Sequence, residues 1–205
     1  MRRHLAALIL LLLPQHGSAE TLQESRWRRA SVPPHRIRTV DAIAARILAN
    51  RPRYEAVARQ TGVPWHVIAG LHHMEAGGSF AKHLHEGSPL TGRTRYIPKG
   101  RPRHGKPPFT WEASAIDALR YDRMDAVRWS ALDATLHACE RYNGTGYLRH
   151  HPQVPTPYLW SHTTLYTRGK YVADGKWSST AVSAQTGIAA IWKRLEAKRQ
   201  LTLPR

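Results

Sequence analysis

Apolar residues recur at helical spacing in several segments of the chain, and this pattern constrains the fold more than any other feature. Residues three and four positions apart share one face of a helix, so this spacing is typical of amphipathic helices. It predicts helices over residues 39–50, 53–60, 64–75, 110–119, 130–142 and 180–195. Thr110 and Ser130 stand where N-cap residues are expected for the helices over 110–119 and 130–142. Gly144 follows the second of these helices, at a position typical of a helix end.

The segment over residues 77–109 interrupts the helical pattern. It is rich in glycine and proline and contains short extended pieces such as "TRYIP". This composition predicts a two- or three-stranded hairpin lobe with long loops. Because 205 residues suffice for one domain with a real core, we expect a single α+β domain that is predominantly helical and carries a small β-hairpin lobe.

The beginning of the chain resembles an export signal. Arg2 and Arg3 precede an apolar run over residues 5–13, and small residues follow as far as Ala19. The run is shorter than the roughly 20 residues that a bilayer span needs. We therefore expect a signal peptide over 1–19, a flexible basic leader over 20–38 and the folded domain over 39–205, in a periplasmic or secreted protein without a stable membrane anchor. An uncleaved anchor is the alternative.

Charge and cysteine content restrict the partners and the means of stabilisation. The formal charge is +17, which favours polyanions: nucleic acid, anionic lipid or acidic polymers of a cell wall. An export signal makes the cell wall the expected partner and nucleic acid an unexpected one, unless the basicity only reflects an arginine-rich genome. Cys139 is the only cysteine, so no intrachain disulfide can form, and its helical context predicts a buried thiol.

Glu75 is the strongest candidate for a catalytic group. It lies in "HHMEAGGSF", residues 72–80, on the same helical stripe as Ile68 and Leu71, and two glycines follow it. A carboxyl group that loses water at the end of an apolar helix face has a raised pKa, and the negative end of the helix dipole acts in the same direction. Glycoside hydrolases use such a neutral acid to protonate a departing sugar oxygen. The alternative is a solvated glutamate in a last helical turn.

Aromatic residues could supply a sugar-binding surface, because sugar rings stack on aromatic faces. Those considered are Trp65, Trp111, Tyr147, Tyr158, Trp160, Tyr166 and Tyr171. Glycine and proline surround Tyr147, Tyr158 and Trp160, so we expect these three to be exposed. For any one aromatic residue, burial in the core is the alternative.

Several strings together resemble a family of bacterial and phage lysozyme-like proteins, related to goose-type lysozymes and soluble lytic transglycosylases. They are "PWHVIAGLHHMEAGGSFAKHLHEGSPLTGRT", "PPFTWEASAIDAL", "ERYNGTGY" and "PYLWSHTTLYTRGKYVADGKW", and the resemblance covers roughly residues 39–195. It implies a lysozyme-like fold in a catalytic domain that cuts the β-1,4 bond between MurNAc and GlcNAc in peptidoglycan. It also implies that the protein acts as a muramidase or a lytic transglycosylase.

The resemblance assigns roles to individual residues. Glu75 matches the catalytic acid and base, Tyr142 and Asn143 match the motif that lines the sugar cleft, and Tyr171 matches a tyrosine near the catalytic carboxylate. A second carboxylate is not assigned, and Glu86 is the only acidic residue between Glu75 and Trp111. In a hydrolase of the inverting type, Glu86, Thr91 or Thr94 would hold the water. The transglycosylase route needs Glu75 alone, and we favour it.

Two other classes of function stay open. His72 and Glu75 have the i, i+3 spacing of paired metal ligands, and His83 with His85 could complete a zinc site, although no strong zinc motif is present. A non-catalytic module could instead bind peptidoglycan, or nucleic acid, through the basic stretch 95–107. With the glycosidase reading we expect no cofactor or metal, a monomer, and peptidoglycan glycan strands as the partner.

Overall fold

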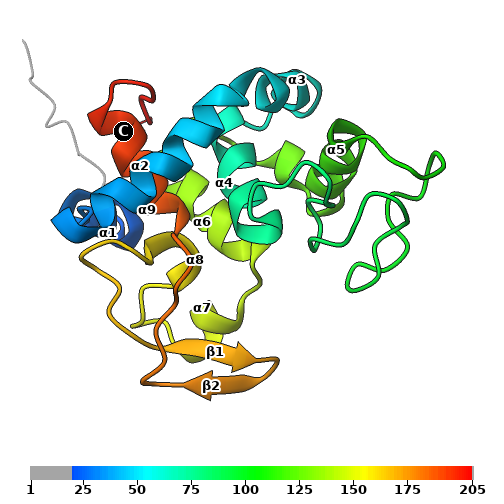
Figure 1. Cartoon of the computed structure of the whole chain (residues 1–205). Coiled ribbons are helices and arrows are strands. Elements are labelled where there is room, and N and C mark those ends of the chain that lie inside the picture. Colours follow the sequence, from blue (N-terminus) through cyan, green and yellow to red (C-terminus); the bar gives the residue numbers. More distant parts are fainter. Residues whose placement is uncertain (1–19, 205) are drawn as a thin grey trace, which may run out of the picture.

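The computed structural model describes residues 20–204 of the chain (Figure 1). In chain order the helices are α1 (Leu22–Arg29), α2 (Pro34–Ala49), α3 (Arg51–Thr61), α4 (Trp65–Ala76), α5 (Trp111–Tyr121), the 3-10 turn η1 (Met124–Ala126), α6 (Leu132–Tyr142), α7 (Gly146–His150), α8 (Pro157–Trp160) and α9 (Ile188–Ala197). Strands β1 (Lys170–Ala173) and β2 (Lys176–Ser178) form an antiparallel pair. The predicted α+β class, with helix predominating, is confirmed.

Helix α4 lies in the middle of the helical body, where α3, α6 and α9 pack against it (Figure 1). Its side chains from His66 to His73 are buried. A Cβ atom at Gly70 would come within 2.9 Å of Ile188 on α9, so glycine permits the close approach of these two helices. The indole of Trp192 on α9 donates to the carbonyl of His66 at 3.1 Å. The core therefore fixes the position of α4 and of its last turn.

Most of the predicted helices are present with shifted ends. The helices predicted over 53–60, 64–75 and 110–119 correspond to α3, α4 and α5, and the Thr110 hydroxyl caps α5 by accepting from Ala113 N–H. Ala131, not Ser130, precedes α6 and makes no capping bond. The last helix starts at Ile188 rather than at Thr180, because residues 179–187 form bends and irregular backbone that ends in a tight contact between Gly187 and the Leu159 carbonyl.

The prediction of a flexible leader over 20–38 is wrong. Thr21 and Glu24 form a reciprocal capping box that begins α1. Trp27 is buried, and the side chain of Gln23 donates to Glu140 on α6 at 2.7 Å. The buried Trp27 and hydrogen bonds from Gln23, Arg26 and Ser31 to distant residues therefore hold this polar segment on the domain. The predicted signal peptide over 1–19 lies outside the described residues.

The predicted hairpin lobe is also misplaced. Within residues 20–204, the segment from 77 to 109 holds only an isolated bridge between Lys82 and Pro89, because its many prolines remove the N–H donors of a ladder. The hairpin lies at 170–178, where Asp174-Gly175 makes the turn and Tyr171 faces Trp177 across the strands. Cys139 is buried and free, as predicted. Among the described helices, none is both long and apolar enough to cross a membrane.

Candidate active site

Glu75 lies in the last turn of α4, one residue before the helix ends. The end is made by Gly77 and Gly78, whose φ angles of 62° and 76° are left-handed. Their N–H groups donate to the carbonyls of His73 and His72, both at 3.1 Å. The two glycines thus end the helix as the sequence predicts, and the chain turns away just after the carboxyl group.

One neighbour holds the Glu75 carboxyl directly. The hydroxyl of Tyr158, on α8, donates to Glu75 Oε1 at 2.8 Å. The pKa of Glu75 is raised to about 7: burial is the largest cause, the charges of Asp122 and Glu86 act in the same direction, and the Tyr158 hydrogen bond acts against them. Near pH 7, about half of the molecules therefore carry a neutral acid at this position.

Glu86 is brought close to Glu75 by the tight loop over 83–88. A Cβ atom at Gly87 would lie only 2.6 Å from the carbonyl oxygen of Glu75, and the φ of Gly87 is +80°, so a glycine is needed for this approach. The Ser88 hydroxyl donates to Glu86 Oε1, and this hydrogen bond occupies one of the two carboxylate oxygens of Glu86. Glu86, the only acidic residue that the sequence offers between Glu75 and Trp111, is therefore a neighbour of Glu75.

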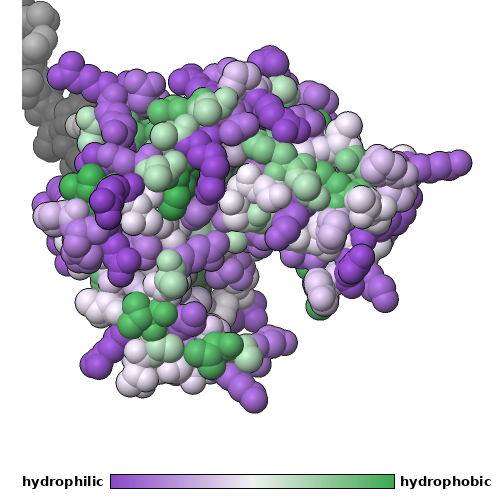
Figure 2. Space-filling model, viewed as in Figure 1, coloured by the Kyte–Doolittle hydropathy of each residue, from purple (hydrophilic) through white to green (hydrophobic). Residues whose placement is uncertain are grey.

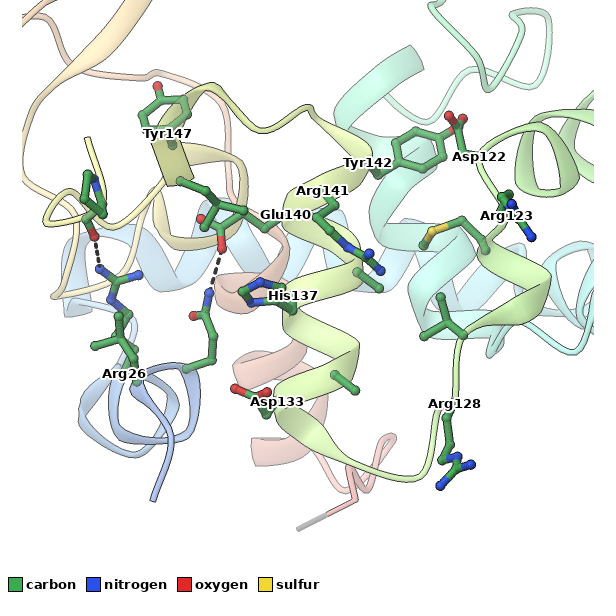
Figure 3. Close-up of a pocket in the computed structure, with 18 of the residues that line it drawn as sticks. Arg26, Asp122, Arg123, Arg128, Asp133, His137, Glu140, Arg141, Tyr142 and Tyr147 are labelled. Carbon is green, nitrogen blue, oxygen red and sulfur yellow. Dashed lines mark hydrogen bonds between the residues drawn. The ribbon is translucent and has the colours of Figure 1, made fainter. Parts of the chain in front are cut away.

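Tyr142 and Asp122 complete the acidic cluster. The Tyr142 hydroxyl, at the end of α6, donates to the carbonyl of Leu84 at 3.2 Å. Its ring lies beside Asp122 at one end of a cavity of about 810 Å³ (Figure 3). Loss of solvent around the carboxyl group raises the pKa of Asp122 to about 6, although the residue as a whole is exposed. Asp122 follows α5 as its cap residue, a place that carries no catalytic signal in the sequence.

A groove of about 820 Å³ begins beside Glu75. It is lined by Met74, which precedes Glu75 in the chain, and by Tyr158, which is hydrogen-bonded to Glu75. At the hairpin, the rings of Tyr147, Tyr171 and Trp177 meet edge to face with centroids 5.3 to 5.7 Å apart. Asn143, His150, His151, Lys170, Asp174 and Gln185 supply the polar lining. The groove therefore combines aromatic faces and hydrogen-bonding groups.

The structure gathers most of the site residues predicted from the sequence, with exceptions. Asn143, Tyr147, Tyr158 and Tyr171 line the groove, and Tyr142 is near Glu75. The hydroxyl that donates to Glu75 is that of Tyr158, and Tyr171 lies farther along the groove lining, on β1.

The predicted exposure of Tyr147, Tyr158 and Trp160 is also wrong, since all three are buried. Trp160 is 0% exposed and belongs to the core. Tyr147 and Tyr158 line the groove although only 7% and 5% of their surface is exposed.

The two threonines proposed to hold water are not placed for it. Thr94 is buried, and its hydroxyl is used by Pro98 and Arg101 within its own loop. Thr91 is exposed, and none of the hydrogen bonds found in residues 20–204 joins it to the Glu75 cluster. The structure thus leaves Glu86 and Asp122 as the carboxyl groups whose charges act on the candidate acid.

The histidines take structural positions. His72 lies between the Tyr54 hydroxyl at 3.0 Å and the Ser79 carbonyl at 3.1 Å, and burial lowers its pKa to about 4. His83 bonds Ser114 and the Gly92 carbonyl, and His85 bonds Asp117. In the part of the chain that the structure describes, no three His, Cys, Asp or Glu residues are grouped as metal ligands. The zinc site considered from the sequence is not formed.

Comparisons with known proteins give no relative: no family model, curated protein or solved structure matches the chain. The function must therefore be argued from the chemistry of the site itself. Its components are a carboxyl group with a pKa near 7, a tyrosine hydrogen-bonded to it, two further carboxyl groups nearby and an aromatic groove.

Proposed function

We propose that this protein cleaves the β-1,4-linked glycan of peptidoglycan, with Glu75 as the acid. The observation that carries the proposal is a carboxyl group of pKa about 7 that is hydrogen-bonded to Tyr158, one of the aromatic residues that line the groove. In its neutral form Glu75 can protonate the glycosidic oxygen as the bond breaks. The resulting carboxylate can then accept a proton, so one residue can serve both steps.

The groove is suited to a saccharide. Sugar rings present apolar C–H faces that stack on aromatic side chains, and their hydroxyls need hydrogen-bonding groups at the rim. Tyr171 and Trp177 lie in the groove lining, where Trp177 has one face stacked on His151, and Asn143 and Gln185 supply hydrogen-bonding groups. Lys170 adds a cation that attracts the carboxylates carried by peptidoglycan peptides.

For the second step we favour transglycosylation, in which the 6-hydroxyl of the muramyl residue gives its proton to Glu75 and closes onto the anomeric carbon. This route needs no second carboxylate. Hydrolysis with inversion would need Glu86 or Asp122 to hold water on the opposite face of the sugar. Tyr158, which lines the groove, donates to Glu75, whereas in the described part of the chain Glu86 and Asp122 make no hydrogen bond to a residue of the groove lining, which supports the route through Glu75 alone.

Within this proposal the fold is lysozyme-like: a helical body supplies the acid from the end of α4, and the lobe with α7 and the hairpin supplies the groove. We propose that the protein works as a monomer, outside the cytosol, on glycan strands. The formal charge of +17 supports an anionic polymer as its substrate.

Digestion of purified peptidoglycan tests the proposal. We expect the protein to clear the suspension and to release muropeptides lighter by one water than reducing ones, which mass spectrometry detects as anhydro ends. Glu75→Gln should abolish clearing while wall binding persists. Glu55→Gln, on the partly exposed pair with Arg51 on α3, is the matched control and should clear normally.

Three other outcomes are informative. Reducing ends would replace transglycosylation with hydrolysis. Wall pelleting without clearing by the unchanged protein would favour the non-catalytic binding module. Clearing by Glu75→Gln at the normal rate would refute the role of Glu75.

A further inference from the structure

A second surface lies away from the groove, on the segment that joins α4 to α5. We call residues 91–110 the basic loop. It contains six lysines and arginines and no acidic residue. In Figure 1 this green segment extends away from the helical body, and in Figure 2 hydrophilic side chains project from the same side of the molecule. The basic loop is therefore a cationic projection rather than part of the core.

Hydrogen bonds hold the basic loop in a defined shape. The Thr94 and Arg101 backbones are joined by Thr94 N–H to Arg101 O at 2.8 Å, and the Thr94 hydroxyl accepts from Arg101 N–H at 2.8 Å. Gly100 N–H also donates to Thr94 O at 3.0 Å. The Arg101 guanidinium makes two bonds to Asp117 on α5, at 2.7 and 2.9 Å. The base is thus fixed to α5 and presents residues 95–99 as a tip.

The tip exposes apolar side chains. Ile97 is 90% exposed and Tyr96 is 70% exposed, the two highest values among the large hydrophobic residues in the described range. A closed, hydrogen-bonded loop could have turned such residues inward, so their outward position points to an apolar partner. Exposed cations flank them: Arg95, Lys99, Arg103 and Lys106. Across residues 20–204, none of these four forms an ion pair with an acidic group.

We propose that the basic loop binds the surface of an anionic lipid bilayer, with Tyr96 and Ile97 entering the interface and the flanking cations meeting lipid phosphates. Cations and apolar residues side by side fit a bilayer surface, which offers negative headgroups above hydrocarbon. Tyrosine is typical of that interface. The long side chains of arginine and lysine can lie along apolar surface and still place their charged groups among the lipid headgroups. Nucleic acid or an acidic wall polymer would engage the cations but would leave Ile97 in water. This surface is independent of the proposed activity at Glu75.

Co-sedimentation with vesicles gives the first test. The full chain should pellet with vesicles of phosphatidylcholine and phosphatidylglycerol and much less with phosphatidylcholine alone, since each cation near an anionic surface contributes about fivefold in partitioning. The double variant Tyr96→Ser, Ile97→Ser should bind the anionic vesicles about tenfold more weakly. The matched control is Val172→Ser, Val182→Ser, at two valines that are 56% and 58% exposed elsewhere. All three proteins share the apolar run at 5–13, so that run cannot cause a difference among them.

A probe placed on the tip gives the second test. Cys139 is buried, so a polarity-sensitive dye will label only an introduced surface cysteine. The emission of the dye on Ile97→Cys should shift to shorter wavelength with anionic vesicles, and that on Val172→Cys should not. Circular dichroism of each variant checks that the fold is kept.

Three results would overturn the proposal. The first is an unshifted Ile97→Cys emission while the protein pellets with vesicles, which would mean that another part of the chain binds. The second is equal loss of binding in the two double variants. The third is a loss of binding to purified peptidoglycan in the Tyr96, Ile97 variant with lipid binding intact, which would identify the basic loop as a polymer-binding surface.

Discussion

Replacing Glu75 with glutamine should change the stability of the protein in a pH-dependent way, whatever reaction the site performs. In the folded protein the pKa of Glu75 is raised from 4.5 to about 7, chiefly by burial. Folding therefore favours the protonated form. The stability that this proton provides is present below about pH 4.5 and is lost as pH rises through 7, where folding has to bury an ionised carboxylate. Glutamine cannot ionise and does not suffer this loss.

The magnitude follows from the rise in pKa. Each pKa unit corresponds to roughly 1.4 kcal/mol, so the rise from 4.5 to about 7 amounts to about 3 kcal/mol. The Tyr158 hydroxyl, which donates to Glu75 Oε1, can donate equally to a glutamine oxygen. We therefore expect Glu75→Gln to match the unchanged protein near pH 4 and to exceed its free energy of unfolding by about 3 kcal/mol near pH 8.

Urea unfolding at several pH values measures this difference, with the fluorescence of the seven tryptophans as the signal. The control is Glu55→Gln, whose carboxylate pairs with Arg51 on the surface of α3 and should change stability by well under about 1 kcal/mol at every pH. A difference between Glu75→Gln and the unchanged protein that is the same at acid and alkaline pH would refute the argument, because Glu75 would then titrate as it does in water.

Three further predictions concern the neighbours of Glu75. Tyr158→Phe removes a hydrogen bond that lowers the pKa of Glu75, so the alkaline limit of wall clearing should move to higher pH. Asp122→Asn removes a negative charge that raises the same pKa, so the limit should move to lower pH, and the pH profile of clearing checks both. Gly87→Ala should be about 1–3 kcal/mol less stable to urea than Gly100→Ala: both glycines have φ of +80°, but only at Gly87 does the new Cβ meet the Glu75 carbonyl. Equal stability of the two alanine variants would contradict this.

Local signals in the sequence were sufficient to predict α4 and the position of Glu75 on it. The helix is apolar on the stripe that contains Ile68 and Leu71, and the glycine pair after Ala76 requires left-handed backbone that ends a helix. Burial of Cys139 followed from helical spacing in the same way. These features depend on residues within a few positions of one another, so a short stretch of sequence is enough to predict them.

The predictions that failed concern features that depend on contacts with distant parts of the chain, and not on the local backbone. Proline and glycine around Trp160 indicate a break in regular structure and so favour exposure, yet α8 packs on α9 and α6 and buries the ring completely. Residues 20–38 fail the prediction in the opposite sense: their polar composition indicates a flexible leader, but the buried Trp27 and hydrogen bonds from Gln23 and Arg26 to distant residues hold them on the domain. In both cases a contact between distant segments decided the outcome.

The same distinction applies to the chemistry of the site. The sequence could predict the direction of the pKa shift of Glu75, because the apolar helix face and the helix end both act locally. It could not name the groups that set the final value: Tyr158 lies 83 positions away, and Asp122 and Glu86 reach the carboxyl group from two other segments. One of these three lowers the pKa and two raise it, so the shift is a balance that the fold creates. A chain that kept "HHMEAGGSF" but lost these partners would keep the carboxyl group of Glu75, but the pKa of that group would change.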